Sequence, residues 1–218
     1  MRSVSSSIAR KAFMGAAGLF LATFLLVHLG INLLLLYRDG GVAFSAAARF
    51  MVTNPVIKVM ELVLFSAFFI HILLGFVTTA YNRKARPERY VVRNDSEAAL
   101  FSKYMMHSGI IVLLFLSLHF LDFYLVKIGL VSPPEGIARE DLYRQALYLF
   151  SSPWYSLLYS GCMIVLGMHL HHAIQSALQT FGIQHAGFQQ VLTITGILYA
   201  IVVAGGFALV PIALLIFR

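Results

Sequence analysis

Charged side chains are scarce in this chain. Of its 218 residues, 11% are Asp, Glu, Lys or Arg and 60% are hydrophobic, and the mean hydropathy is +0.84. Ordinary soluble domains carry about 25% charged residues, so a soluble domain built from this sequence would lack its charged surface. The scarcity excludes a soluble enzyme, a disordered protein and a nucleic-acid-binding protein, and it predicts an integral membrane protein.

Cysteine is nearly absent as well. Cys162 is the single cysteine, so the chain can form neither an intrachain disulfide nor a thiolate metal cluster. Acidic residues are few: 9 Asp and Glu stand against 16 Lys and Arg, which gives a net charge of +7. In a membrane protein such an excess of basic residues determines how the helices are oriented across the membrane. It does not indicate a nucleic-acid-binding surface there.

Five apolar segments are long enough, at about 20 residues or more, to cross a bilayer as helices. Helices are expected because backbone groups in lipid must form hydrogen bonds within their own segment. The sequence therefore predicts one all-α membrane domain over residues 1–218. We expect its spans at about 12–37, 59–81, 104–126, 154–180 and 188–217. The loops contain a short amphipathic stretch at about 44–51 and an expected short helix at about 140–150, and both could lie along the membrane interface.

The basic residues near the span ends predict the orientation. Nine of them lie on the side of the N-terminus and seven on the other side, and five of the nine fall within 83–93. By the positive-inside rule this favours a multi-pass protein of the cytoplasmic membrane with its N-terminus in the cytoplasm. The first apolar run is too long for a signal-peptide core, and no clear cleavage site follows it, so we interpret it as a span.

Four histidines lie well inside the first four spans, one in each: His28, His71, His119 and His169. An ionisable residue inside a membrane indicates a functional site by default. With a rise of about 1.5 Å per residue and alternating helix directions, His28 and His119 fall at one outer depth. His71 and His169 fall at one inner depth. Two histidines from different helices at one depth can hold an iron from both sides, so the pattern predicts two bis-histidine haem b sites stacked across the bilayer.

Several neighbours bear on this prediction. Asn32 lies one turn after His28 on the same face, and we consider it for a bond to the haem, to the histidine or to another helix. A single tetrahedral zinc ion does not suit histidines at two depths. Small residues would let helices and a flat macrocycle approach closely. The glycines concerned are Gly30, Gly75, Gly109, Gly161 and Gly167.

The segments around these histidines carry a family resemblance. They read VHLGIN, FIHILLG and SLHFLD around the first three, and MHLHHAIQSALQTFGI from Met168. Over nearly its whole length the chain resembles the cytochrome b membrane anchor of succinate dehydrogenase and fumarate reductase (respiratory complex II), in its single-chain, five-helix, di-haem type.

The resemblance implies a ligand set. By it, His28 and His119 hold the outer haem, and His71 and His169 hold the inner one. The choice of His169 over His171 or His172 rests on its distance to the helix end at 181–183, which matches the family. His172 lies close to the same helical face and stays a competitor for the inner iron.

The resemblance also implies partners. In this family a flavoprotein subunit oxidises the dicarboxylate in the cytoplasm, and an iron–sulfur subunit docks on the cytoplasmic face of the anchor. The basic stretch 83–103 is a candidate for that dock, and its alternative role is to determine topology. The substrate of the anchor is a membrane quinone near the outer haem, and the resemblance favours menaquinone. A higher oligomer of the whole complex is also allowed.

Reduction of a quinone consumes two protons, which a carboxyl group can relay. Glu61 and Asp122 are the acids within or bordering the spans, and both lie toward the outer side. They are the candidate catalytic residues, and Asp122 follows His119 by three positions on the helix. An interfacial acid bonded to Arg or Lys is the alternative for each. Some relatives have a carboxylate beside the haem ligand of the fourth span; residues 165–168 contain none.

Two other functions are consistent with parts of the pattern. A di-haem cytochrome b anchor of a hydrogenase or formate dehydrogenase would share the histidines, although their context favours the succinate-type family. A haem-free transporter could use the histidines for helix contacts or proton relay.

We expect no role for His107 beyond the interface and none for His185. The remaining aromatic residues near span ends are expected to form the interfacial belt: Tyr37, Tyr81, Tyr104, Trp154 and Tyr155.

Overall fold

The computed structural model describes residues 7–85, 97–183 and 189–217. Five of its helices are long and apolar enough to cross a membrane, and the described residues contain no strand. These helices are α1 (Ser7–Leu33), α3 (Pro55–Ala85), α4 (Glu97–His119), α7 (Pro153–Thr180) and α8 (Gln189–Phe217). The prediction of an all-α membrane protein with five spans is confirmed, and the span limits agree to within a few residues.

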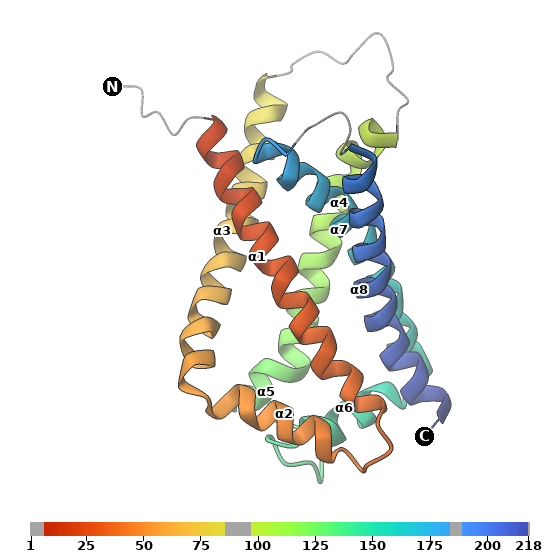
Figure 1. Cartoon of the computed structure of the whole chain (residues 1–218). Helices are drawn as coiled ribbons and strands as arrows, with labels where there is room; N and C mark the ends of the chain where they lie inside the picture. The colour runs from red at the N-terminus through yellow and green to blue at the C-terminus, as the bar shows by residue number, and fades with distance from the viewer. Residues whose placement is uncertain (1–6, 86–96, 184–188, 218) are drawn as a thin grey trace.

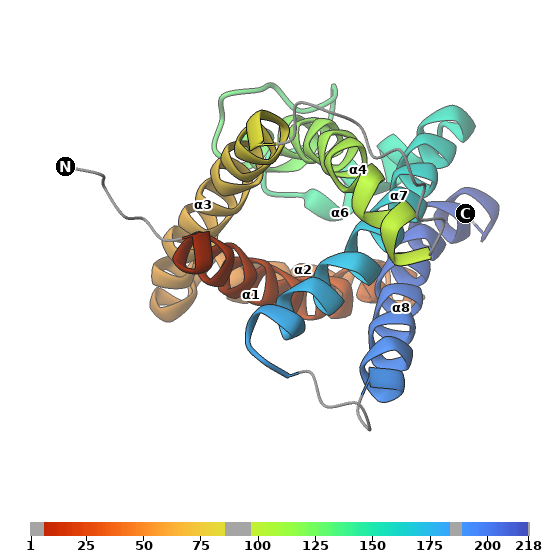
Figure 2. The same ribbon diagram turned by 90° about the horizontal axis from the view of Figure 1, so that it is seen from above.

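Successive spans run in opposite directions (Figure 1). Helix α1 begins at the end of the molecule where α3 ends and α4 begins, which we call the inner face. Helix α8 ends at the opposite, outer face. Seen from above, α1 lies between α3 on one side and α7 with α8 on the other, and α4 packs against α7 (Figure 2). The chain order therefore brings residues of α1, α3, α4 and α7 to the middle of the bundle.

Two short helices cover the outer face: α2 (Val42–Thr53) and α6 (Leu142–Phe150), as predicted from their amphipathic sequences. The backbone amides of Ala43 and Gly41 donate to the Asp39 carboxylate at 2.8 and 2.9 Å and cap α2. These bonds hold the pKa of Asp39 below its usual value. The cap therefore stabilises the fold at neutral pH and weakens as the pH falls through that lowered pKa.

The tightest packing lies between α7 and α8. Met163 and Leu166 of α7 and Ala200 and Val203 of α8 belong to one buried cluster. Helix α3 differs, because Ala67 is the one buried residue among its side chains whose burial is described. Its half-buried positions include a stripe at alternating spacings of three and four, which faces the bundle. The stripe consists of Glu61, Leu64, Phe68, His71, Gly75 and Thr78.

Two local features depart from the predicted spans. Helix α3 begins at Pro55 rather than near residue 59, because the Asn54 side chain caps it by accepting from the Val56 amide at 2.9 Å. Proline suits a first helical position, where no amide is needed. In the third span, α4 passes into a π-helical turn, η2 (Phe120–Tyr124), and then into α5 (Leu125–Lys127). Such turns occur frequently at functional sites.

Two glycines of α7 provide a test of the α7–α8 packing. A Cβ added at Gly167 would lie 2.9 Å from the Cβ of Ala204, whereas a Cβ at Gly161 would meet nothing within 4 Å. Both substitutions by alanine gain about 1 kcal/mol of helix propensity, but overpacking costs about 1–3 kcal/mol. We expect a lower melting temperature for Gly167→Ala and an unchanged or higher one for Gly161→Ala, measured by circular dichroism in detergent. Equal stability of the two variants would contradict this packing.

Candidate functional site

The outer histidines meet in the middle of the bundle. The ring centroids of His28 on α1 and His119 on α4 are 5.8 Å apart, with the rings nearly perpendicular. Aromatic side chains surround the pair: Phe24 and Phe207 pack on the His28 ring, and Phe115 and Phe123 on the His119 ring. His28 and His119, which helix depth predicts as the outer pair, therefore lie side by side, and their role as haem ligands stays a prediction.

The inner histidines each lie over a glycine of another helix. A Cβ at Gly18 of α1 would lie 3.3 Å from Cε1 of His71, and a Cβ at Gly109 of α4 would lie 3.4 Å from Cε1 of His169. Small residues at these two positions therefore let both imidazoles lie close to their neighbouring helices. Gly109 was among the predicted glycines, and Gly18 was not.

Ser108 determines which nitrogen of His169 is free. Its hydroxyl donates to the Met105 carbonyl at 3.0 Å and lies 3.1 Å from Nδ1 of His169. When the single hydroxyl proton lies on the Met105 carbonyl, Ser108 accepts from His169 and Nδ1 carries the ring proton. The other ring nitrogen, Nε2, then has the free lone pair that a metal ligand requires.

Unpartnered buried atoms mark both depths. Among the described residues, Nδ1 of His71 and Nδ1 of His119 are buried without a hydrogen-bond partner. Such groups are rare in native proteins, and each calls for a physical explanation. The described residues contain no group of three or more His, Cys, Asp or Glu side chains that could hold a metal ion. Haem iron takes one or two protein ligands, and whether the imidazoles at the two depths hold haems stays a prediction.

Asp122 lies at the centre of a polar cluster beside the outer pair. One oxygen of its carboxylate accepts hydrogen bonds from the hydroxyls of Tyr155, at 2.5 Å, and Tyr159. The Tyr159 ring is 5% exposed and lies 6.4 Å from the His119 ring, centroid to centroid. Tyr159 therefore connects the carboxylate to the outer histidine.

A residue of the outer helix α6 holds the π-turn that presents Asp122. The side chain of Gln145, 2% exposed, donates to the backbone carbonyl of Asp122. Glu61, the other predicted acid, lies on the inward stripe of α3 and is hydrogen-bonded to the Tyr124 hydroxyl. Neither acid forms an ion pair with Lys or Arg within the described part of the chain. The described structure thus surrounds both acids with tyrosines rather than with cations.

Other predicted residues lie as follows. The Asn32 side chain donates to the His28 backbone carbonyl at 2.8 Å, so it supports its own helix, and contact with a haem stays a prediction. His107 is exposed beside Tyr104, as expected for an interfacial residue. His185 and Arg86, Arg89 and Arg93 of the basic stretch lie outside the described residues.

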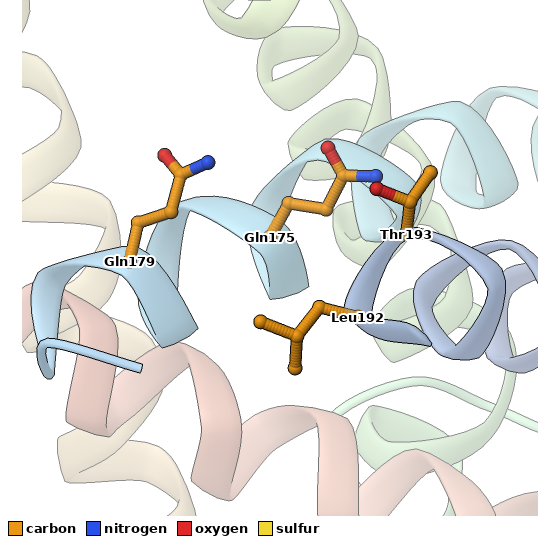
Figure 3. A pocket seen from close by; sticks show the side chains of 4 residues that line it. All are labelled: Gln175, Gln179, Leu192 and Thr193. Atoms are coloured by element: carbon orange, nitrogen blue, oxygen red, sulfur yellow. The ribbon is translucent and has the colours of Figure 1, made fainter. Parts of the chain in front are cut away.

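The two histidines that could compete with His169 are placed differently. His171 lies 3.0 Å from Gln175, nitrogen to nitrogen, beside a small recess between α7 and α8 that Gln175, Gln179, Leu192 and Thr193 line (Figure 3). His172 interacts electrostatically with His169. His172 therefore stays the closer competitor.

Residues that matter here were missed at the sequence level. Tyr155 was assigned to the interfacial belt, but its hydroxyl bonds Asp122 within the bundle. The other belt residues are exposed, Trp154 at 82%. Tyr159 follows Tyr155 by one helical turn, and two tyrosine hydroxyls on one face of a span could have indicated a polar site in the sequence. Gln145, on the buried side of an amphipathic helix, could have indicated the same site.

Comparison with family models, with curated proteins and with solved structures found no match for this chain. The function of the chain is therefore inferred from the geometry of its own residues.

The bond from Tyr159 to Asp122 should stabilise the outer half of the bundle. Hydrogen bonds to charged groups contribute about 1.5–3 kcal/mol, so we expect Tyr159→Phe to lower the melting temperature in detergent. The control is Tyr148→Phe, on the exposed side of α6, which should melt like the wild type. If the two variants melt alike, Tyr159 does not hold Asp122 as described.

Proposed function

We propose that this chain is a di-haem cytochrome b membrane anchor of the succinate:quinone oxidoreductase type. The observation that supports it most is the 5.8 Å separation of His28 and His119, together with the shared inner depth predicted for His71 on α3 and His169 on α7. The resemblance of the four histidine segments supports the particular family.

The proposed ligands divide by depth. His28 and His119 would hold the outer haem, and His71 and His169 the inner haem. Haem iron supplies one-electron transfer when it is bound, with a potential set by its ligands and their surroundings. The chain's own residues orient the ligands: Ser108 fixes the proton of His169, and the aromatic side chains around the outer pair exclude water from it.

The proposed quinone end lies at the outer haem, where the resemblance places it. Asp122 is the better candidate for proton exchange with the quinone, because Tyr159 links its carboxylate to the His119 ring. As the quinone is reduced it takes up protons, which the Asp122 carboxyl group would relay, with the half-buried Tyr155 hydroxyl hydrogen-bonded to the same carboxyl oxygen. Glu61 on α3, which interacts with Tyr124 of the π-turn, is a second candidate.

The proposed partners meet the inner face. An iron–sulfur subunit, itself bound to a dicarboxylate-oxidising flavoprotein, would deliver electrons there to the inner haem. Arg10, Lys11, Arg83 and Lys84 lie at the inner ends of α1 and α3. These charges support a cytoplasmic inner face in the cytoplasmic membrane. Lipid surrounds the remaining apolar faces.

Substitution of the histidines tests the ligand assignment. We expect His28→Ala or His119→Ala to lose the outer haem, and His71→Ala or His169→Ala to lose the inner haem, in dithionite-reduced minus oxidised spectra. His107→Ala, with an exposed ring, is the control and should keep both haems. Full haem retention in His169→Ala would show that His169 is not the ligand and would assign that role to His172. Co-purification with a succinate-oxidising flavoprotein, rather than with a hydrogenase or formate dehydrogenase, tests the family.

The Ser108 bond gives a second test. An acceptor at Nδ1 raises the basicity of a ligating imidazole and favours ferric iron. We therefore expect Ser108→Ala to raise the midpoint potential of the inner haem in a spectroelectrochemical titration. Ser117→Ala is the matched control on the same helix, because the Ser117 hydroxyl bonds only its own helix, at the Leu113 carbonyl. An equal shift in both variants would count against the assignment of His169.

A further inference from the structure

One hydroxyl on the inward stripe of α3 is left without a partner. The Oγ1 atom of Thr78 is buried and forms no hydrogen bond with any described residue. A buried hydroxyl without a partner destabilises the fold, because it has lost its hydrogen bonds to water without replacement. Thr78 follows His71 by seven residues, so it lies on the same face of the helix, about 10 Å closer to the inner face.

The lack of a partner is unusual within this chain. A threonine or serine in a helix can donate to the carbonyl four residues earlier, and several here do so. These are Thr23, Thr53, Ser66, Ser117 and Thr180. The equivalent carbonyl for Thr78 belongs to Leu74, and the bond is not made. The Thr78 hydroxyl is therefore turned away from its own helix while it stays buried.

The next residue shows the contrast. Thr79 lies about 100° further around the helix, and its hydroxyl donates to the sulfur of Met106 on α4 at 3.6 Å. Thr79 therefore bridges α3 to α4. Thr78 has no such bridge, although it belongs to the half-buried stripe that carries His71. The two adjacent threonines have the same side chain, but only the Thr79 hydroxyl has a hydrogen-bond partner.

Positive charge lies beside the same part of α3. The guanidinium of Arg10 on α1 stacks over the Tyr81 ring at 4.4 Å, and Tyr81 is three residues beyond Thr78. A hydroxyl donor and a cation near the inner end of one helix suit an anionic acceptor at that depth. A haem carries two carboxylates at one edge, its propionates, and an ionised carboxylate inside a membrane protein needs such donors.

We propose that Thr78 donates a hydrogen bond to a propionate of the inner haem and so orients that haem toward the inner face. The proposal rests on the proposed function, since it requires a haem held by His71 and His169. It assigns Thr78 as a positioning residue, because its hydroxyl touches the cofactor's edge and not the iron.

The test is a spectroelectrochemical titration of the haem-loaded protein. Loss of the donor leaves the propionate charge less neutralised, which stabilises ferric iron. We expect Thr78→Val to lower the midpoint potential of the inner haem, identified as the component that is lost in His71→Ala. The outer haem should not move. Thr79→Val, the matched control, should leave both potentials as in the wild type, and Thr78→Ser, which keeps the hydroxyl, should restore the wild-type potential.

The outcomes separate the two levels of inference. Two haems with unchanged potentials in Thr78→Val would overturn the Thr78 assignment and leave the proposed function standing. A shift of the outer haem alone, or an equal shift in Thr79→Val, would also overturn it. A folded wild-type protein without haem would refute the proposed function, and the Thr78 assignment with it.

Discussion

The cost of placing imidazoles in the interior of a membrane protein governs this structure. Apolar helices can carry such groups only where the groups find partners, and the chain places them in pairs at two depths. His28 meets His119 within a ring of phenylalanines, and the inner pair lies over Gly18 and Gly109. The order of the helices and the sparse packing of α3 are consistent with bringing four histidines from four spans to the middle of the bundle.

The two ends of the bundle differ in chemistry. At the outer end, a carboxylate, two tyrosine hydroxyls and a buried amide gather at the π-turn of the third span. That arrangement suits proton exchange next to an electron carrier. At the inner end, the hydroxyls of Ser108 and Thr78 and the cation of Arg10 lie near the second pair. That arrangement suits orientation of a charged cofactor. The chain thus combines electron transfer along its length with proton chemistry at one end, as we propose.

Much of the fold was predictable because it depends on local quantities. Span number follows from the lengths of apolar runs, and histidine depth follows from the rise per residue. The proximity of Asp122 to His119 follows from their spacing of three. Its tyrosine partners come from positions 33 and 37 residues later, so they depend on how α7 rotates against the third span. Gly18 was not predicted because its contact with His71 depends on how α1 packs against α3, and no local sequence pattern shows this.

The most direct test of the central claim is the haem content of the purified wild-type protein, measured as pyridine haemochrome and compared with the amount of chain. The proposed function predicts two haem b per chain, with both haems reducible by dithionite. A folded, monodisperse protein without haem, and without a visible absorption band, would contradict it and would favour a transporter that uses its histidines for helix contacts or proton relay.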